Sequence, residues 1–401
     1  MVSVNEGMRT IFQGAYTEKL NVSEFIDSID PRDIPFLAML GWGSEAGSVS
    51  AGVDTLAFPC TRPQHTWQND TLIPQQGTLG ANYTSGGGIV TLAAEEEHYI
   101  RVGDQLLVND VHYIVTGLNG DDTIDVTVLS GSADANHTSG DRWYNLGSLR
   151  LDGEAFPTDY LSTDLTSDTN FTQIFSNAVS VSGTSEATEK YGIADEFDRE
   201  FAKKFQEMIL ELEYAALYGL RSSTFPSANT TRSAVRRMGG LYNFVRANSD
   251  ANRTNASSAT LTEKMLVDLL QNIWEDGGKP DTIMVNATQK RVLDSFIVPF
   301  VRTDIGNDRA GVILGQYVSD FGTLDVVLSR RIRPSDLIVF QKEYIGIGPL
   351  KGNGNDRSFF MTPVPVKGDS REAVITGEYT MEVRNADAAH GWIYNLGTTL
   401  A

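Results

Sequence analysis

The chain has almost no cysteine and a shortage of positive charge. Its 401 residues include one cysteine, Cys60, and 32 Lys and Arg against 52 Asp and Glu, a formal net charge of −20 at pH 7. A single cysteine excludes an internal disulfide framework and a cysteine-rich zinc site. A protein this acidic is a poor candidate for wrapping nucleic acid, because phosphate binding requires a local excess of Lys and Arg.

Long apolar runs are missing as well. No stretch approaches the roughly 20 apolar residues that a membrane-spanning helix needs. The first residues have neither a basic start nor a continuous apolar run, so we expect no signal peptide. With 41% hydrophobic residues, 37 Gly and 13 Pro, the composition is that of a folded, turn-rich protein.

Motifs that carry chemistry are equally scarce. The run from Gly86 to Gly88 lacks the following Lys of a phosphate-binding loop, and no His-Glu-x-x-His zinc motif occurs. Residues 134–141 suggest a calcium loop only faintly, because the glycine comes one place late and the distal Glu is missing. Cys60 and His65 lack an orienting third group. We therefore expect no enzyme, no catalytic residue, no bound metal and no cofactor.

Two short basic islands interrupt the acidic chain. They are Arg236-Arg237 and the group of Arg330, Arg331 and Arg333. Salt bridges between subunits and contacts with DNA both explain such islands, and we favour the salt bridges.

The first half of the chain predicts extended segments around a small β-module. Residues 1–43 have little periodicity and indicate an arm that lies on another surface. Residues 48–72 are extended, with prolines typical of an edge strand or an exposed hairpin. From 86 to 147, short alternating runs between Gly-Asp and Asn-Gly turns predict an inserted β-barrel or sandwich. A second extended run covers 171–182.

The strongest local signal is a long amphipathic helix. Capping residues near Thr184 predict a helix from about Glu186 to Tyr218, about 30 residues and so about 45 Å long. Apolar residues recur at helical spacing and form a stripe that we expect to be core: Phe197, Phe201, Phe205, Ile209 and Leu212.

The last third predicts an α/β region followed by a β-tail. The tail, 358–396, alternates as antiparallel strands do. The elements expected before it are helices at 261–274 and 287–297 and strands at 282–285, 324–328 and 336–340.

This order of parts resembles the major capsid proteins of tailed bacteriophages, whose fold is named after phage Hong Kong 97. Several stretches carry a closer resemblance: 25–37 (arm), 64–72 (E-loop strand), 102–104, 126–128, His137 and Gly140 (β-module), 179–184 with Tyr191 (approach to the spine helix) and 390–396. They are similar to the capsid family typified by phage SU-ten. The β-module departs from that family in having Leu129-Ser-Gly131 where a basic residue and a glycine are usual.

The resemblance implies an α+β, Hong Kong 97-like capsid fold with an N-arm, an E-loop, a long spine helix, peripheral and axial domains, and an inserted small β-barrel or sandwich module. The expected domains are an N-terminal arm (1–47), E-loop strands and flanks (48–85 and 158–185), the β-module (86–157), a peripheral domain with the spine helix (186–260), an axial domain (261–345) and a peripheral β-tail (346–401).

The function that the resemblance implies is structural: a major capsid protein that self-assembles into hexamers and pentamers of an icosahedral shell enclosing double-stranded DNA. The subunit would be made in the bacterial host cytoplasm and would reside in the virion capsid. Its partners would be copies of itself, a portal, decoration proteins and a separate scaffolding protein, since no scaffold-like helical domain precedes the arm. No membrane contact and no sequence-specific DNA binding are implied.

Physical reasoning adds two expectations. The arm and E-loop lack the apolar periodicity of a private core, so neighbouring subunits would order them, with Trp42, Phe58 and Trp67 as candidate inter-subunit anchors. An acidic lumenal wall would let packaged DNA slide without sticking.

One alternative from another class remains at this point. A secreted or virion-tail carbohydrate-binding protein or hydrolase would use the β-module, where Tyr99, Tyr113, Trp143 and Tyr144 offer rings for sugar stacking.

Overall fold

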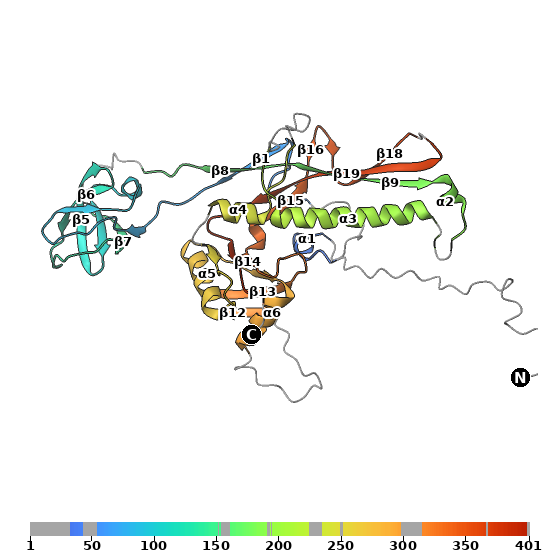
Figure 1. Cartoon of the computed structure of the whole chain (residues 1–401). Coiled ribbons are helices and arrows are strands. Elements are labelled where there is room, and N and C mark those ends of the chain that lie inside the picture. The colour runs from blue at the N-terminus through green and yellow to red at the C-terminus, as the bar shows by residue number, and fades with distance from the viewer. Residues whose placement is uncertain are drawn as a thin grey trace, which may run out of the picture. The chain divides into compact units, whose positions relative to one another are not determined.

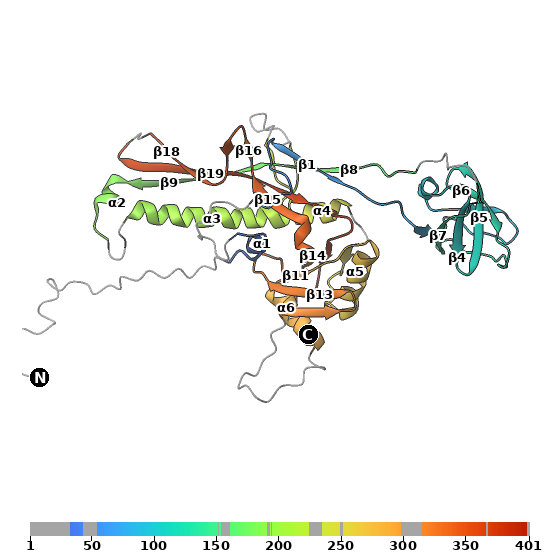
Figure 2. The ribbon, with the colours of Figure 1, turned by 180° about the vertical axis from the view of Figure 1, so that it is seen from behind.

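The computed structural model describes residues 33–42, 54–150, 152–153, 161–190, 193, 195–223, 235–248, 252–297, 315–365 and 368–398. The chain divides into two compact units (Figure 1). One comprises Gln68–Ser167, and the other Met1–Trp67 with Asp168–Ala401. The second contains a long helix with its covering sheet and a separate six-stranded sheet, which Figure 2 shows from behind.

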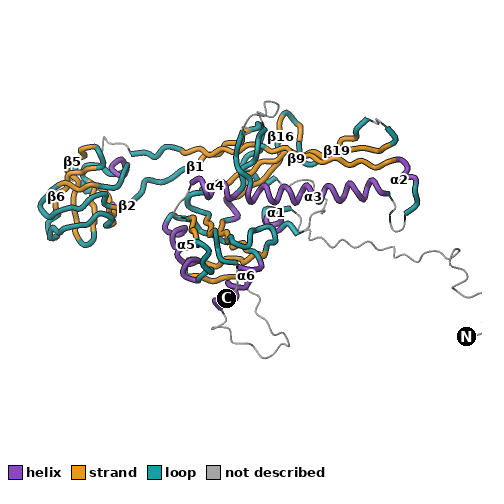
Figure 3. The backbone as a smooth tube through the Cα atoms, viewed as in Figure 1, coloured by secondary structure: helices purple, strands orange, loops and turns teal. Residues whose placement is uncertain are grey.

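The long helix, α3 (Glu196–Tyr218), lies against one face of an antiparallel sheet (Figure 3). In that sheet β9 (Gln173–Ser182) pairs with β19 (Ser370–Val383) over ten residue pairs, from Gln173–Tyr379 to Ser182–Ser370. Strands β15 (Ile345–Pro349) and β18 (Phe360–Pro363) also pair with β19. Residues nearly 200 positions apart in sequence thus build one layer over the helix.

The helix begins later than the sequence predicts. A short helix, α2 (Gly183–Ala187), ends before Thr188, and α3 begins after Asp195, whose carboxylate accepts hydrogen bonds from the N–H groups of Phe197 (2.7 Å) and Asp198 (3.1 Å). Because Asp195 is an extended N-cap residue, the helix cannot continue back to Glu186. The predicted helix of about 30 residues is therefore wrong at its start, and α3 has 23 residues.

The apolar stripe of α3 forms the core of this layer. Phe197, Ile209 and Leu212 are buried, and Phe201 and Phe205 are half-buried and packed against the same core. The rings of Phe201 and Phe205 stack at 6.5 Å between centroids. At the other end of α3, Gly240 precedes α4 (Leu241–Asn248) and lies so close to α3 that a Cβ there would be 2.6 Å from two of its carbonyl oxygens.

The second sheet has six strands and a core of its own. The helices α5 (Glu263–Glu275) and α6 (Ala287–Ile297) pack on it, and the oxygen of Thr262 caps α5. In order, its strands are β10 (Arg253–Asn255), β20 (Gly391–Tyr394), β14 (Leu337–Phe340), β11 (Thr282–Val285), β13 (Gly322–Leu328) and β12 (Gln316–Ser319).

The C-terminal tail therefore divides between the two sheets. Strand β19 covers α3, but β20 pairs with β14 and β10 in the six-stranded sheet. Assigning the whole tail, 346–401, to one peripheral sheet is wrong for its last strand, because β20 pairs in the six-stranded sheet. There Ile393 joins the core under α5 and α6, while Trp392 on the other face packs into the core under α3. The short strands β16 (Lys351–Gly352) and β17 (Asn355–Asp356) form a hairpin before β18.

Residues 76–148 fold as a closed β-barrel. The strand order is β2-β7-β4-β5-β6-β3, and the ends of this row are joined by hydrogen bonds from Ala93 N to Thr78 O (2.9 Å) and from Gly80 N to Thr91 O (3.0 Å). The strands are β2 (Gln76–Thr78), β3 (Ile89–Thr91), β4 (Asp104–Val108), β5 (Val111–Gly120), β6 (Thr123–Val128) and β7 (Arg142–Ser148), with a 3₁₀ turn at Glu96–Tyr99. Because β2 is part of the barrel, the predicted start at residue 86 is too late.

Alternate residues of the barrel strands point into its core. Tyr113 and Trp143 are completely buried there, and the indole N–H of Trp143 donates to Glu96 (2.8 Å). Two of the four aromatic residues proposed for sugar stacking are thus core residues, which removes half of the basis for the carbohydrate alternative.

Two further features complete the described chain. Strands β1 (Gln64–Asn69) and β8 (Thr166–Phe171) pair as a two-stranded ribbon at the two junctions of the barrel with the rest of the chain. Of the helices in the described ranges, none combines the length and the apolar character needed to cross a bilayer.

Replacing Leu212 by Ala tests the core under α3. Leu212 is completely buried, so Leu212→Ala should lower the free energy of unfolding by about 2–5 kcal/mol. Urea unfolding of unassembled subunits, followed by circular dichroism, measures this change. Glu211→Ala, at the exposed neighbouring position, is the matched control and should have little effect; equal effects of the two changes would contradict the packing.

Candidate assembly interface

The first element of the candidate interface is the base of the N-terminal segment. Helix α1 (Pro35–Met39) is held by Glu213 of α3, whose carboxylate accepts hydrogen bonds from the N–H groups of Phe36 (3.0 Å) and Leu37 (2.8 Å). Phe36 also packs edge-on against Phe340 (5.7 Å). The chain that leaves this point toward the N-terminus is therefore fixed to its own subunit at α1.

Glu213 is completely buried. Burial raises its pKa to about 7, although the two N–H donors favour the charged form and limit the rise. At neutral pH the carboxyl group of Glu213, which holds α1, is therefore close to half ionised.

The second element is the root of the β1–β8 ribbon. The buried amide of Asn170 donates to the carbonyl oxygens of Gly239 (2.9 Å) and Met381 (2.7 Å), and its oxygen accepts from Gly239 N (2.8 Å). Trp67 packs against Phe244 with 5.5 Å between ring centroids. Trp67 of β1 and Asn170 of β8 thus fix both strands of the ribbon to the packed core of the subunit.

Two buried carboxylates on β19 hold the same root. Glu378 accepts a hydrogen bond from Thr172 (2.6 Å) and forms ion pairs with Arg236 (3.0 Å) and Arg357 (2.8 Å). Glu382 pairs with His65 on β1 (3.1 Å).

His65 is cationic at neutral pH. Burial lowers its pKa, but hydrogen bonds with Cys60 and Glu382 raise it more, to about 9. The stabilisation from this pair is complete below pH 6.5 and is lost as the pH rises through 9.

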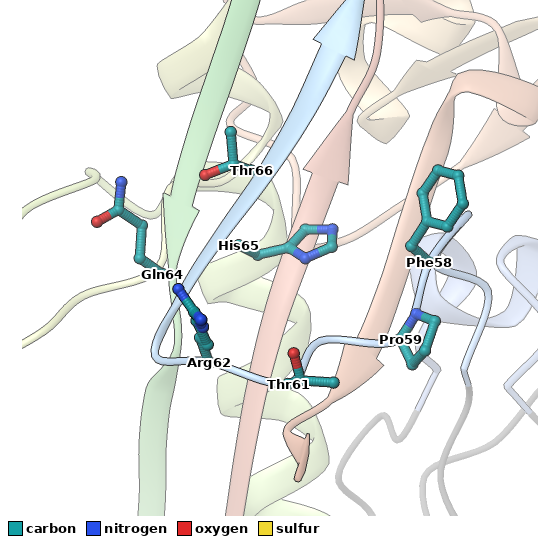
Figure 4. A pocket seen from close by; sticks show the side chains of 7 residues that line it. All are labelled: Phe58, Pro59, Thr61, Arg62, Gln64, His65 and Thr66. Atoms are coloured by element: carbon teal, nitrogen blue, oxygen red, sulfur yellow. The ribbon is translucent and has the colours of Figure 1, made fainter.

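A pocket lies beside this ion pair, where the chain turns into β1 (Figure 4). Its volume is about 490 Å³. In Figure 4 the ring of His65 points back toward the stretch that carries Phe58 and Pro59, and Arg62 lies at the turn. Phe58 is 71% exposed. The pocket therefore has an exposed aromatic ring, and the exposed Arg62 adds a positive charge at the surface.

The third element is the sheet face that α3 does not cover. Twelve side chains of β9, β19 and β18 point away from the helix. Two of them are charged, Glu372 and the buried Glu378, and Glu378 is neutralised by ion pairs with Arg236 and Arg357. The twelve are Ile174, Ser176, Ala178, Ser180, Ser182, Ser370, Glu372, Val374, Thr376, Glu378, Phe360 and Thr362. A chain with 21% charged residues thus presents a nearly neutral exposed face here, which we call the outer sheet face.

Comparison with known proteins decides what kind of molecule carries these features. A family model described as SU10 major capsid protein matches residues 4–397. The chain belongs to the SU10 major capsid protein family. It is thus a structural protein of a phage capsid, and its place is the virion capsid.

Several solved structures are similar to this capsid protein. The capsid asymmetric unit of cyanophage A-1(L) matches with a TM-score of 0.54 at 10% identity, covering 97% of this chain and 99% of that chain. A structure from Microbacterium phage Oxtober96 matches with a TM-score of 0.47 at 10% identity, covering 96% of this chain and 98% of that chain. The SrpI encapsulin complex from Synechococcus elongatus matches with a TM-score of 0.40 at 10% identity, covering 59% of this chain and 79% of that chain. No curated protein sequence matches.

The likeness to the cyanophage A-1(L) capsid structure shows the α+β, Hong Kong 97-like capsid fold that the sequence indicated. As a member of a capsid protein family, the chain has a structural role. Its assembly partners include other capsid subunits.

The three predicted anchors lie in different environments in this capsid protein. Trp42 is buried against Phe359 and Tyr379 (6.1 Å to each ring), and Trp67 is buried against Phe244. Contacts within their own subunit bury both tryptophan rings, so their burial needs no neighbouring subunit. Phe58 alone of the three offers its ring to another molecule, and its role as an anchor stays a prediction.

The basic islands and the faint calcium loop also find partners within the subunit. Arg236 pairs with Glu378, and Arg330 with Asp33 (3.6 Å). The carboxylate of Asp134 accepts hydrogen bonds from Tyr113, Tyr83 and Gly86 N. Over the described ranges, no three acidic, His or Cys side chains group as metal ligands.

Sequence reasoning missed the buried polar groups that hold the extended segments. Asn170, Glu378 and Glu382 lie in stretches that contain other polar residues, so nothing distinguishes them. Glu213 carried a usable signal, because it lies four residues after Ile209 and three before Ala216, within the apolar stripe.

Glu213 predicts a dependence of stability on pH. Its folded pKa of about 7 lies above the ordinary 4.5, so the stability it contributes is complete below pH 4.5 and is lost as the pH rises through 7. Glu213→Gln should remove this part of the slope, which amounts to about 3 kcal/mol at most. Urea unfolding of unassembled subunits from pH 4.5 to 8 measures it. The exposed Glu211→Gln is the control and should keep the slope; a slope unchanged in Glu213→Gln would refute the assignment.

Proposed function

We propose that this capsid protein assembles with copies of itself into hexamers and pentamers of an icosahedral shell around double-stranded DNA. In this proposal the contacts are non-covalent and are made by extended segments that reach neighbouring subunits. The outer sheet face carries the proposal, since it is exposed and nearly neutral while its opposite face is covered by α3.

The ribbon of β1 and β8 is the occupant that we propose for this face in a neighbouring subunit. The small side chains of Ser176, Ala178 and Ser180 allow a ribbon to approach closely, and Ile174 and Phe360 add apolar area at the edges. Rigid roots at Asn170, Glu378 and Glu382 support such a role, because a segment fixed at its base loses less entropy on docking.

We assign the parts of the fold to the expected domains on this basis. Segment 1–47 is the N-arm, β1 and β8 belong to the E-loop, α3 is the spine helix, and its covering sheet belongs to the peripheral domain. The six-stranded sheet is the axial domain. Phe58 and the adjoining pocket form a second proposed contact between subunits.

The remaining partners follow from the same proposal. A separate scaffolding protein, a portal and decoration proteins would act with the shell, and the subunit would be made in the host cytoplasm. DNA would be enclosed without sequence-specific contacts.

A charge placed on the outer sheet face should block assembly. Ala178→Arg would bury an unpaired guanidinium at each contact, at a cost of several kcal/mol. We expect folded subunits with an unchanged unfolding midpoint but few closed shells, measured by sedimentation and negative-stain microscopy. Gln271→Arg on α5 is the control and should leave shells intact. Normal shells from Ala178→Arg would refute this contact.

Two truncations separate folding from assembly in the N-terminal segment. Removal of 1–32 keeps the α1 anchor, so the subunit should stay folded while failing to form regular shells. Removal of 1–43 also takes away the buried Phe36, Leu37 and Trp42, so it should lower the unfolding midpoint as well. Regular shells from the first truncation would contradict the role of the arm, and equal midpoints would contradict the anchor.

A further inference from the structure

The chain contains two Asn–Gly dipeptides, and each belongs to a β-hairpin. Asn119-Gly120 ends β5, just before the turn into β6, and Asn353-Gly354 forms the two-residue turn between β16 and β17. In such a dipeptide the asparagine can lose its side-chain amide by attack of the following backbone nitrogen, because glycine has no side chain to shield that nitrogen. The two dipeptides have the same chemistry, so the fold decides which of them reacts.

Both reacting groups of the first dipeptide are engaged in hydrogen bonds. The side-chain amide of Asn119 donates to the carboxylate of Asp125 (2.7 Å), and the N–H of Gly120 donates to that of Glu97 (2.9 Å). Gly120 is also paired with Thr123 in the ladder between β5 and β6, two strands of the closed barrel. Two carboxylates therefore hold the amide and the attacking nitrogen apart.

The reacting groups of the second dipeptide are exposed and unengaged. Within the described ranges, no hydrogen bond involves the side chain of Asn353 or the N–H of Gly354. Both residues are exposed, as are the two that follow them. The nitrogen of Gly354 and the amide of Asn353 are thus accessible to each other and to water whenever the turn changes its conformation.

The hairpin that carries this turn is small enough to open locally. It has two residue pairs, Lys351 with Asp356 and Gly352 with Asn355, and a hairpin of this size is at best marginally stable by itself. The turn has positive φ angles, 51° and 77°, as a two-residue Asn–Gly turn requires. Rotation away from these angles brings the backbone nitrogen to the side-chain carbon, and few contacts oppose it.

We propose that Asn353 is a site of spontaneous deamidation in the folded subunit and that Asn119 is protected from the same reaction. The nitrogen of Gly354 forms a bond to Cγ of Asn353, the bond from Cγ to Nδ2 breaks, and the N–H proton leaves with Nδ2 as ammonia. Water then opens the cyclic imide at either carbonyl, which gives aspartate or isoaspartate at position 353. Water is the co-reactant, and the redox state of the chain does not change.

The modification would alter a hairpin that holds the stretch leading into β1. The N–H of Lys351 donates to the carbonyl oxygen of Cys60 (2.6 Å), and Leu350 forms a parallel bridge with Cys60. The ammonium of Lys351 is already shared by Asp54 (2.8 Å) and Asp356 (3.5 Å), so a further carboxylate at the turn adds unpaired negative charge. Isoaspartate also lengthens the backbone by a methylene group, which a two-residue turn does not accommodate.

Peptide mapping by mass spectrometry tests the proposal on unassembled subunits of the full chain. The subunits are incubated in mildly alkaline buffer made with heavy-oxygen water, which marks the sites that react during the incubation. We expect steady conversion at Asn353. Conversion at Asn119 should be about 100-fold slower, the factor expected when two hydrogen bonds to carboxylates must break first.

Two controls separate the effect of the fold from that of the sequence. In urea the unfolded chain keeps both dipeptides but loses their surroundings, so the two sites should react at similar rates. Asp125→Ala removes the acceptor of the Asn119 amide. In the folded protein it should speed conversion at Asn119 about tenfold and leave the rate at Asn353 unchanged.

Each result of these measurements supports the proposal or overturns it. Equal rates at the two sites in the folded subunit would overturn it, as would an intact Asn353 under conditions in which the same site reacts in urea. An unchanged rate at Asn119 in Asp125→Ala would contradict the protection by hydrogen bonding. Because unassembled subunits are used, the outcome does not depend on the proposed shell.

Discussion

The structure depends on covering the apolar stripe of α3. A single helix of 23 residues cannot bury Phe197, Ile209 and Leu212 by itself, and the cover comes from the pairing of β9 with β19. That pairing joins the stretch after the barrel to the C-terminal tail, so the sheet over α3 forms only when both distant segments come together. Because it brings the tail back to α3, it also delivers β20 to the second sheet and links the two cores.

Buried carboxylates then determine where the remaining segments attach. Glu213 holds α1, Glu378 holds the residues beside β8, and Glu382 holds β1 through His65. A buried carboxylate without partners costs several kcal/mol, so each of these groups tolerates only the register that supplies its donors. The described parts of the extended segments are therefore fixed to their own subunit at specified points.

The sequence predicted elements whose pattern is local. Strand β11 and helix α6 were found at their observed bounds, and the stripe on α3 faces the core. The start of α3 was missed, because one N-cap residue overrides helical periodicity. The sheet of β20 and the partners of Glu213 were beyond reach, since they depend on contacts between residues more than 50 positions apart. Of the three predicted anchors, two tryptophans proved to be core, because aromatic residues suit an interior and an interface equally well.

The negative charge of the chain is concentrated in one of its two units, and this bears on how the acidity is explained. The barrel unit contributes −12 of the net −20, which leaves 37 acidic and 29 basic residues for the other 301. Many of those basic residues are paired within the subunit, as Arg236 and Arg357 are with Glu378. Repulsion of DNA by the whole protein is therefore a weaker explanation of the acidity than it was from composition. The excess belongs to the barrel unit, where 15 acidic residues stand against three basic ones, so the acidity of the chain is a property of one module more than of the whole subunit.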